Sequence, residues 1–348
     1  MRRFALALPA GGVALLLLAV VLWPRPASSN PVTPAAVPAA NPGESATYRI
    51  VIPGISHDVA RRATLAAVGD VMLARSVGEA IVTGGPGVPF AGVAAALRDA
   101  DLAVANLECS ISERGEPAPK GFTFRAPPLA ADALAGAGID IASLANNHIL
   151  DYGPDALSDT IALLDGRGIA HAGAGEDAAR ARTPAIVTRG GMRIAFLSYV
   201  DVPLEWQGFD TRQWEATAAA PGVAWLHIED VKADVAAARR LADLVVVLMH
   251  FGFEEQYSPS ETQRAQARAA IDAGAVLVIG HHPHVLQPVE WYGKGLIVYS
   301  LGNFIFDGWD NPSNETAVLF AELGDEGVLS YRMAPAWIDG NGFPWLVE

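Results

Sequence analysis

The stretch VLVIGHHPHVLQ, residues 276–287, joins an uninterrupted aliphatic run to three histidines within four positions. An apolar run of this kind is typical of a strand that is buried on both faces. The chain has only eight histidines in 348 residues, so three directly behind one strand indicate a chemical role. Residues 275–282 are therefore predicted to form a buried strand that ends in side chains able to bind a metal ion.

Four more segments share this continuous apolar character, and helical patterns lie between them. The predicted strands are 64–70, 101–108, 139–148, 243–250 and 275–282. The predicted helices are 90–100, 128–138, 154–168, 229–242 and 260–274. Ser260 and Gln263 have capping-box spacing, and Pro154 suits the first turn of a helix. Strand followed by helix, repeated along the chain, predicts an α/β fold with a largely parallel sheet.

Each predicted strand ends in polar side chains of the kind that bind metals. In a parallel sheet the carboxyl ends of the strands meet at one edge, so we expect these side chains to come together at one edge of one sheet. Imidazole, carboxylate and amide groups without a second thiol suit one or two divalent ions such as Mn, Fe or Zn. The residues concerned are Asp70, Glu108, Asn147, His148, His250, His281, His282 and His284.

Three further segments read as hairpins rather than as strand–helix units. They are 184–200, 289–307 and 315–338, and glycine pairs or a Gly-Lys-Gly triplet mark turns in the first two. We expect them to supply antiparallel strands to a second sheet.

The N-terminal part has the pattern of an export segment. Arg2 and Arg3 precede an apolar run from Phe4 to Trp23, whose length approaches the roughly 20 residues that span a bilayer. Residues 1–25 are predicted to be a membrane anchor, with a cleaved signal peptide as the alternative. Residues 26–62 read as a Pro/Ala-rich linker, and 63–348 as the folded domain. The arginines predict a cytoplasmic N-terminus and a body at the extracytoplasmic face of the membrane.

Composition limits the partners of the exported part. The formal charge of the chain is −14, and residues 1–25 hold three arginines and no acid, which leaves −17 on the remainder. Such a surface repels nucleic acid, and it repels any polyanion that is not held through a cation. The single cysteine, Cys109, excludes an internal disulfide, so the core or bound metal must stabilise the domain.

Five blocks of sequence carry most of the polar residues at the strand ends. The blocks are AAVGDVMLAR (66–75), ANLECSIS (105–112), SLANNHILDYG (143–153), LMHFGFEEQYSPS (248–260) and GHHPHVLQPVEWYGKGLIVYSLGNFIFD (280–307). In order and spacing they together resemble the CapA (PgsA) family of poly-γ-glutamate capsule synthesis. That family is related to the calcineurin-like metallophosphoesterases. The resemblance implies a four-layer α/β/β/α sandwich built from two sheets and flanking helices.

The resemblance also implies a role for each matching position. Asp70, Asn147, His250, His282 and His284 would be metal ligands, and Glu108 would bridge two ions. His148 would act as the acid or as the partner of a developing oxyanion. Two positions depart from the phosphoesterase pattern, since Met72 stands where a histidine is expected and Glu108 where an aspartate is expected.

Six residues are candidates for contacting substrate. Arg75 and Arg125 would hold an anionic group, and the resemblance adds Glu255 and Tyr257 from the block after His250. Because side chains alternate along a strand, His281 is expected to support the site rather than bind the ion. Asn303 either orients a ligand or satisfies a local turn.

These observations predict an exported, membrane-tethered protein of capsule synthesis that depends on metal. Its partners would be an anionic polymer or a phosphate-containing substrate, and a membrane synthase complex, but no nucleic acid. Two alternatives stay open. One is an extracytoplasmic metal-dependent phosphoesterase, a hydrolase of the metallophosphoesterase superfamily, and the other is a non-catalytic scaffold of a synthase complex.

Overall fold

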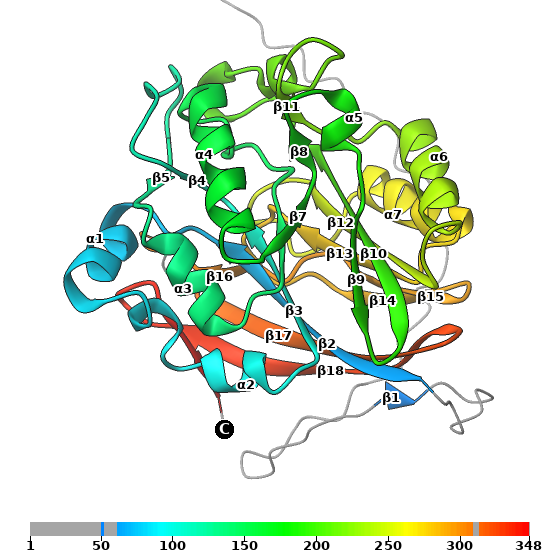
Figure 1. Cartoon of the computed structure of the whole chain (residues 1–348). Coiled ribbons are helices and arrows are strands. Elements are labelled where there is room, and N and C mark those ends of the chain that lie inside the picture. The colour runs from blue at the N-terminus through cyan, green and yellow to red at the C-terminus, as the bar shows by residue number, and fades with distance from the viewer. Residues whose placement is uncertain (1–49, 52–60, 309–312, 348) are drawn as a thin grey trace, which may run out of the picture. The chain divides into compact units, whose positions relative to one another are not determined.

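The computed structural model of this chain describes residues 50–51, 61–308 and 313–347 (Figure 1). The expected anchor, residues 1–25, and most of the expected linker, 26–62, lie outside the described residues. Among the helices that are described, none is long and apolar enough to cross a membrane.

The first sheet has nine strands in the order β1-β18-β17-β2-β3-β6-β7, with β16 beside β2 and β19 beside β18. β2, β3, β6 and β7 are parallel to one another, whereas β17 runs antiparallel to β2. The strands are β1 (Ile50–Val51), β2 (Arg62–Val71), β3 (Leu102–Leu107), β6 (Ile141–Ser143), β7 (Ala170–Ala172), β16 (Asn303–Ile305), β17 (Glu315–Gly324), β18 (Gly327–Ile338) and β19 (Pro344–Leu346).

The second sheet has six strands in the order β14-β15-β13-β12-β10-β9. β10, β12, β13 and β15 are parallel, and β9 and β14 flank them as antiparallel edges. The strands are β9 (Ala185–Arg189), β10 (Met192–Asp201), β12 (Leu244–Phe251), β13 (Leu277–His281), β14 (Val289–Tyr292) and β15 (Gly295–Val298). Two small sheets pair β4 (Ser110–Ile111) with β5 (Arg125–Ala126) and β8 (Ala174–Gly175) with β11 (Gly222–Val223).

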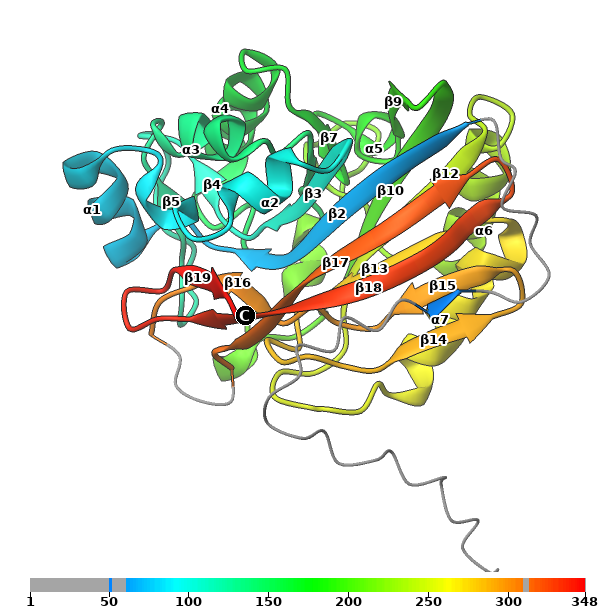
Figure 2. The same ribbon diagram turned by 90° about the horizontal axis from the view of Figure 1, so that it is seen from below.

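Helices cover the outer face of each sheet. On the first sheet the apolar core includes residues of α1 to α4, and on the second it includes residues of α5 to α7 (Figures 1 and 2). The helices are α1 (Arg75–Gly84), α2 (Ala94–Arg98), α3 (Ala130–Ala137), α4 (Gly153–Asp165), α5 (Ala178–Ala181), α6 (Ile228–Ala238) and α7 (Glu261–Ala273). Short 3₁₀ turns are η1 (Val88–Phe90), η2 (Trp206–Gly208) and η3 (Thr211–Trp214).

A third apolar core lies between the two sheets. It brings Leu65 of β2 together with Phe196 of β10 and Ile279 of β13, all without solvent exposure. Two sheets packed face to face with helices outside are the four-layer α/β/β/α sandwich that the sequence predicts. The predicted fold class is confirmed.

The predicted division of strands between the sheets is wrong in two respects. The five strands that end in ligand-type residues do not share one sheet, because β2, β3 and β6 belong to the first and β12 and β13 to the second. The hairpin β17–β18 joins the first sheet, beside β2, rather than the second. Strands buried on both faces have the same apolar pattern in either sheet, so the pattern carries no information about which sheet a strand joins.

Local helix signals from the sequence agree with the structure. Ser260 and Gln263 form the capping box of α7, and Pro154 lies in the first turn of α4. The expected helix over 90–100 shortens to α2, which follows the 3₁₀ turn η1. The expected strand over 139–148 ends at Ser143, so Asn147 and His148 lie in the turn that follows β6.

Candidate metal centre

The carboxyl ends of the parallel strands in both sheets face a common edge of the sandwich, and β2 delivers Asp70 to it. Gly69 allows this approach, since a Cβ at this position would lie 2.0 Å from the Gly302 carbonyl oxygen. The Asp70 backbone N–H donates to that same oxygen at 2.9 Å. Asp70 is wholly buried, and its carboxylate accepts hydrogen bonds from Asn106 Nδ2 at 2.8 Å and from the His282 backbone N–H at 3.2 Å.

The charge of Asp70 is stabilised by the imidazoles around it. His284 Nδ1 lies 3.4 Å from one carboxylate oxygen and His250 Nδ1 lies 4.0 Å from the other. Burial alone would raise the pKa of Asp70, but the contact with His284, whose own pKa is raised, holds the pKa of Asp70 below its ordinary value. Asp70 is therefore ionised and available as a ligand.

Glu108 follows β3 and is the strongest indication that a cation belongs here. Among the described residues neither of its carboxylate oxygens has a hydrogen-bond partner, although the side chain is wholly buried. His284 Nε2 lies 3.8 Å and His148 Nε2 lies 3.9 Å from Glu108 Oε1. Burial, together with the charges of Asp70 and Glu254, raises the pKa of Glu108 well above its ordinary value. A buried carboxylate without donors is costly, and a bound cation would remove that cost.

His250 at the end of β12 and Asn147 after β6 approach each other across the two sheets. His250 Nε2 lies 2.7 Å from Asn147 Oδ1, and Asn106 Nδ2 lies 3.2 Å from His250 Nδ1. Burial and the neighbouring His282 keep the pKa of His250 well below its ordinary value. The imidazole is neutral, which is the form that binds metal.

The turn after β13 is strained and presents two histidines. His282 has φ 94° and His284 has φ 57°, a left-handed conformation that costs non-glycine residues free energy. His284 Nδ1 donates to Asn303 Oδ1 at 2.8 Å, which fixes its ring. Burial and the neighbouring His284 lower the pKa of His282 to about 3. Such strain persists at functional sites because the surrounding structure holds it in place.

Two sets of three side chains are close enough to share an ion. Asp70, Glu108 and His250 form a fully buried set, whereas in the other set Glu254 is exposed and His282 and His284 are buried. Within each set the potential ligand atoms lie within 4.8 Å of one another. Carboxylate and imidazole ligands suit Mn, Fe or Zn without deciding among them, so the residues present fit the expected divalent metal.

His148 lies beside this cluster and is oriented by Asp151. Its Nδ1 donates to Asp151 Oδ2 at 2.7 Å, which leaves Nε2 directed toward Glu108. The ring packs on Phe124 with 4.2 Å between centroids. Burial and the charge of Lys120 lower the pKa of His148 well below its ordinary value. Neutral His148 has a fixed tautomer whose Nε2 can accept a proton.

A buried lysine, which the sequence reading missed, holds this region together. Lys120 Nζ is 2.6 Å from Asp151 Oδ1 and 2.7 Å from Glu205 Oε1, and it donates to the Asn147 carbonyl at 2.6 Å. Glu205 also accepts from Asn147 Nδ2 at 2.9 Å, which turns the amide oxygen of Asn147 toward His250. Lys120 and Glu205 lie in irregular segments rather than at strand ends, so no strand pattern points to them.

A pocket of about 560 Å³ opens onto the cluster. Phe122 and Phe124 form apolar walls, while Arg75, Glu255 and Gly308 lie on other parts of the lining. The Arg75 guanidinium pairs with Asp307 and lies 4.9 Å from the Phe124 ring centroid. Asn147, His148, Glu254 and His284 also line the pocket, which therefore gives solvent access to the metal-ligand candidates.

The structure separates the candidate substrate residues. Arg75 and Glu255 line the pocket, whereas Tyr257, half exposed, does not. Arg125 donates to the Arg114 and Gly115 carbonyls and lies 4.2 Å from the Tyr152 ring centroid. It lines a different hollow, outside the pocket at the metal centre. Asn303 contacts His284, and His281 Nε2 donates to the Val68 carbonyl at 3.2 Å.

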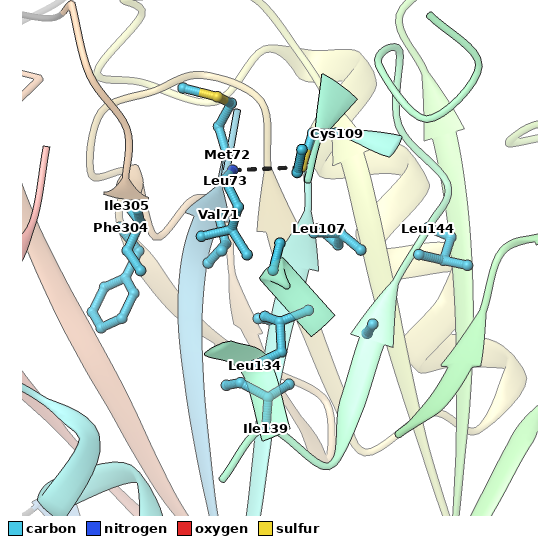
Figure 3. Packing of buried hydrophobic residues seen from close by; sticks show 14 of the residues in the cluster. Val71, Met72, Leu73, Leu107, Cys109, Leu134, Ile139, Leu144, Phe304 and Ile305 are labelled. Atoms are coloured by element: carbon cyan, nitrogen blue, oxygen red, sulfur yellow. Dashed lines mark hydrogen bonds between the residues drawn. The ribbon is translucent and has the colours of Figure 1, made fainter. Parts of the chain in front are cut away.

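Met72 belongs to the apolar core rather than to the ligand cluster. It is wholly buried, and its sulfur lies 3.2 Å from the Ala74 backbone nitrogen. Figure 3 shows it beside Leu73, whose backbone N–H donates to Cys109 Sγ at 3.4 Å. The thioether is also a soft ligand, unsuited to a borderline ion.

Comparison with known proteins gives consistent matches over most of the folded chain. Residues 64–308 match the family model described as "Bacterial capsule synthesis protein PGA_cap". A "Capsule biosynthesis protein CapA" of Bacillus anthracis is 32% identical over 286 residues, covering 81% of this chain and 69% of that protein. A "PGA biosynthesis protein CapA" of Bacillus subtilis (strain 168) is 31% identical, covering 77% of this chain and 70% of its own length.

Among solved structures, a phosphatase from Mycoplasma pneumoniae has a similar fold. Its TM-score is 0.51 at 12% identity, and the match covers 79% of this chain and 93% of that one. At this level of identity the likeness concerns the fold alone, which is metallophosphoesterase-like.

Proposed function

This chain belongs to the family of bacterial capsule synthesis proteins, and from that premise we propose that it acts in making or exporting poly-γ-glutamate or a related anionic surface polymer. In this proposal the activity depends on one or two divalent metal ions bound at the strand ends. The body works at the extracytoplasmic face of the membrane, within a synthase complex.

The observation that carries the metal-dependent part of the proposal is Glu108. Both oxygens of this wholly buried carboxylate lack a partner among the described residues, and histidine nitrogens lie just under 4 Å away. Removing a carboxylate from water without donors costs several kcal/mol, roughly, unless a cation replaces the lost hydration. The cluster therefore has the character of a site built for a cation.

The acidic surface supports an anionic polymer as the partner that needs this cation. The part after residue 25 carries −17, and the pocket lining adds Glu254 and Glu255 beside Arg75, which Asp307 already neutralises. A polyanion would be repelled from such a pocket unless a metal offered positive charge. The same logic argues against nucleic acid as a partner.

The side chains around the cluster suit proton transfer to or from a bound substrate. A divalent ion, when bound, would polarise a carbonyl or phosphoryl oxygen and lower the pKa of coordinated water. His148 is held by Asp151 with Nε2 free toward the cluster, in position to accept or return a proton. Phe122 and Phe124 would shield the reacting group from bulk water.

The His148–Asp151 pair favours a second candidate function, which is metal-dependent hydrolysis of a phosphate-containing substrate. Full-length protein supplied with Mn²⁺ should be tested against phosphomonoesters, phosphodiesters and γ-linked glutamate polymer. Turnover of phosphate esters that is lost in Asp70→Ala and His282→Ala would favour this second candidate over the first. Cleavage or transfer of the polymer would favour the first.

The cellular test of the main proposal is a gene deletion in the native organism. Loss of surface polymer, restored by the wild-type gene and not by Asp70→Ala, is the expected result. His227→Ala is the matched control, because His227 lies on the surface with its Nε2 2.8 Å from Glu215 Oε1, away from the cluster. Unchanged polymer in the deletion strain would contradict the proposal.

The proposed location rests on Arg2, Arg3 and the apolar run of residues 4–23, which lie outside the described residues. A C-terminal reporter enzyme that works only outside the cytoplasm should be active on the full chain and inactive when residues 1–25 are removed. Fractionation then separates an anchor from a cleaved signal. Reporter activity without residues 1–25 would refute the role assigned to this segment.

A further inference from the structure

We propose that Glu254 is a metal ligand of this site and that it supplies the contact which Met72 cannot make. This inference rests on the proposed metal dependence and adds a specific ligand from outside the strand ends. The metal centre then has two parts. The buried part consists of Asp70, Glu108 and His250, and the part at the pocket consists of Glu254, His282 and His284.

Met72 cannot bind the metal, because of where its side chain packs as well as because of its chemistry. Met72 has no solvent exposure and belongs to the apolar core that underlies α1 to α4. Its sulfur is already in contact with the Ala74 backbone N–H at 3.2 Å. A thioether is a soft ligand that suits Cu(I) better than Mn, Fe or Zn. Residues at the end of β2 therefore provide Asp70 alone, and another segment must complete the centre.

Glu254 lies where such a ligand is needed. It follows His250 by four residues, on the loop that leaves β12, and it lines the pocket. One of its carboxylate oxygens lies within 4.8 Å of ligand nitrogens of both His282 and His284. Two ligand atoms bound to one ion at the usual bond lengths of about 2.0–2.2 Å lie at most about 4.4 Å apart, so small side-chain movements bring this carboxylate and the two imidazoles onto one ion.

The loop that carries Glu254 is fastened to the turn that carries the two histidines. The Glu255 backbone N–H donates to the Pro283 carbonyl at 2.8 Å, and Pro283 lies between His282 and His284. Glu255 itself is held at φ 57°, in the left-handed region that is costly for a glutamate. A strained residue anchored to the ligand turn pre-organises its neighbour Glu254, which is the support that a metal site requires.

Ion pairs occupy two of the four acidic residues in the pocket lining and leave Glu254 and Glu255, of which only Glu254 lies near His282 and His284. Glu205 is paired with Lys120, and Asp307 with Arg75. Within the described part of the chain, the Glu254 side chain has no hydrogen bond and no lysine or arginine partner, and its charge helps to raise the pKa of His284. Glu108, wholly buried, is a second carboxylate without a partner, and it too adjoins His284. A cation held between these two carboxyl groups and the imidazole would remove the cost of burying Glu108 without a donor.

The position of Glu254 also has a consequence for substrate. The set Asp70, Glu108 and His250 is closed off from solvent, whereas Glu254 is exposed at the pocket. An ion held by Glu254, His282 and His284 would have three ligands from this set, which would leave a position for substrate on the pocket side. We expect anionic groups of the substrate to meet this ion first, and the buried set to stabilise its site.

Metal binding to full-length protein tests the inference directly. Wild type, Glu254→Gln and Glu255→Gln are titrated with Mn²⁺ by calorimetry, and free Mn²⁺ is followed by electron paramagnetic resonance. Wild type should bind two ions. Glu254→Gln should keep one and bind the other at least about 10-fold more weakly, because losing a direct ligand costs no less than losing a supporting residue. Glu255→Gln is the matched control, since it removes the same charge from the adjacent position, and it should behave as wild type.

Three outcomes would overturn the inference. The first is a Glu254→Gln variant that binds both ions as tightly as wild type. The second is a Glu255→Gln variant that weakens binding equally, which would make the effect one of general charge. The third is a wild-type protein that binds no ion, which would also contradict the proposed metal dependence. Failure of the Glu254 inference alone is therefore distinguishable from failure of the proposed function. Circular dichroism and thermal unfolding check that the variants fold, as expected for a change at an exposed side chain.

Discussion

Replacing Lys120 by methionine should destabilise this protein far more than replacing an exposed lysine. The Lys120 side chain is wholly buried, and its Nζ lies within 2.7 Å of oxygens from Asp151 and Glu205. Methionine fills a similar volume but leaves the buried Asp151 carboxylate without its counter-ion. It also removes the hydrogen bond to the Asn147 carbonyl, so the turn that carries Asn147 and His148 loses a support.

The loss of stability in Lys120→Met depends on the burial of the two carboxylates that lose their partner. Asp151 has no solvent exposure and Glu205 has only 11%, so water cannot replace the ammonium group. Breaking a buried ion pair on one side costs about 3–5 kcal/mol, whereas an exposed pair is worth about 0–1 kcal/mol. We therefore expect Lys120→Met to lower the free energy of unfolding by about 3–5 kcal/mol. The double variant Lys120→Met/Asp151→Asn should lose less, because it no longer buries an unpaired charge at position 151.

Urea denaturation at pH 8, followed by circular dichroism, measures these differences. Lys232→Met is the matched control, since Lys232 pairs with Glu229 on the exposed face of α6 and should cost less than about 0.5 kcal/mol. If Lys120→Met costs no more than Lys232→Met, the buried ion pairs of Lys120 do not stabilise the fold. The same conclusion follows if the double variant is less stable than the Lys120→Met single variant.

Three more predictions concern pH, metal and backbone packing. Burial raises the pKa of Asp151 to about 7, so between about pH 4 and pH 7 the native state holds a proton that the unfolded state releases. The protonated carboxyl therefore contributes fully to the free energy of unfolding below about pH 4. This contribution falls by up to about 4 kcal/mol as the pH rises to 7. Urea denaturation from pH 4 to 8 should give a flatter profile for Asp151→Asn, and parallel profiles would contradict this. Mn²⁺ at 100 times its dissociation constant should stabilise wild type by about 2.7 kcal/mol and Glu108→Ala by much less, as measured by thermal unfolding. A wild-type melting temperature that is the same with Mn²⁺ and with chelator would count against the site. Gly69→Ala should lower the free energy of unfolding by more than about 2 kcal/mol, because its Cβ would lie 2.0 Å from the Gly302 oxygen. Gly87→Ala, with open space at its Cβ, should be near neutral. Equal urea midpoints for the two variants would show that β2 can move away from Gly302.

The positions of most ligand candidates could be predicted because they depend on local pattern. Asp70, Glu108 and His250 each come directly at the end of an apolar run, and such runs in parallel sheets end at a shared edge. The capping box of Ser260 and Gln263 was equally readable, because a capping interaction spans only three residues. These features are set by spacing along the chain.

Other members of the site had no such signal. Lys120, Glu205 and Glu254 come from loops, and what distinguishes them is the set of groups that folding brings within reach. Arg125, predicted from its charge to hold an anionic group, lies outside the pocket at the metal centre, donates to two carbonyl oxygens and stacks on Tyr152. A charged residue in a loop has the same sequence signature in either role.

The sequence by itself determined the α/β class, the places where strands end and the kinds of ligand at those ends, because hydrophobic periodicity and side-chain chemistry are local properties. Only the tertiary structure decided that β2 and β3 lie in one sheet and β12 and β13 in the other, and that Asp70 consequently faces His250 across the sandwich. It also decided which acids acquire a counter-ion, as Glu205 does from Lys120, and which do not, as with Glu108. Sheet pairing and ion pairing join residues that are far apart in the chain. The free energies of these interactions depend on burial and distance, which cannot be read from any single segment of sequence.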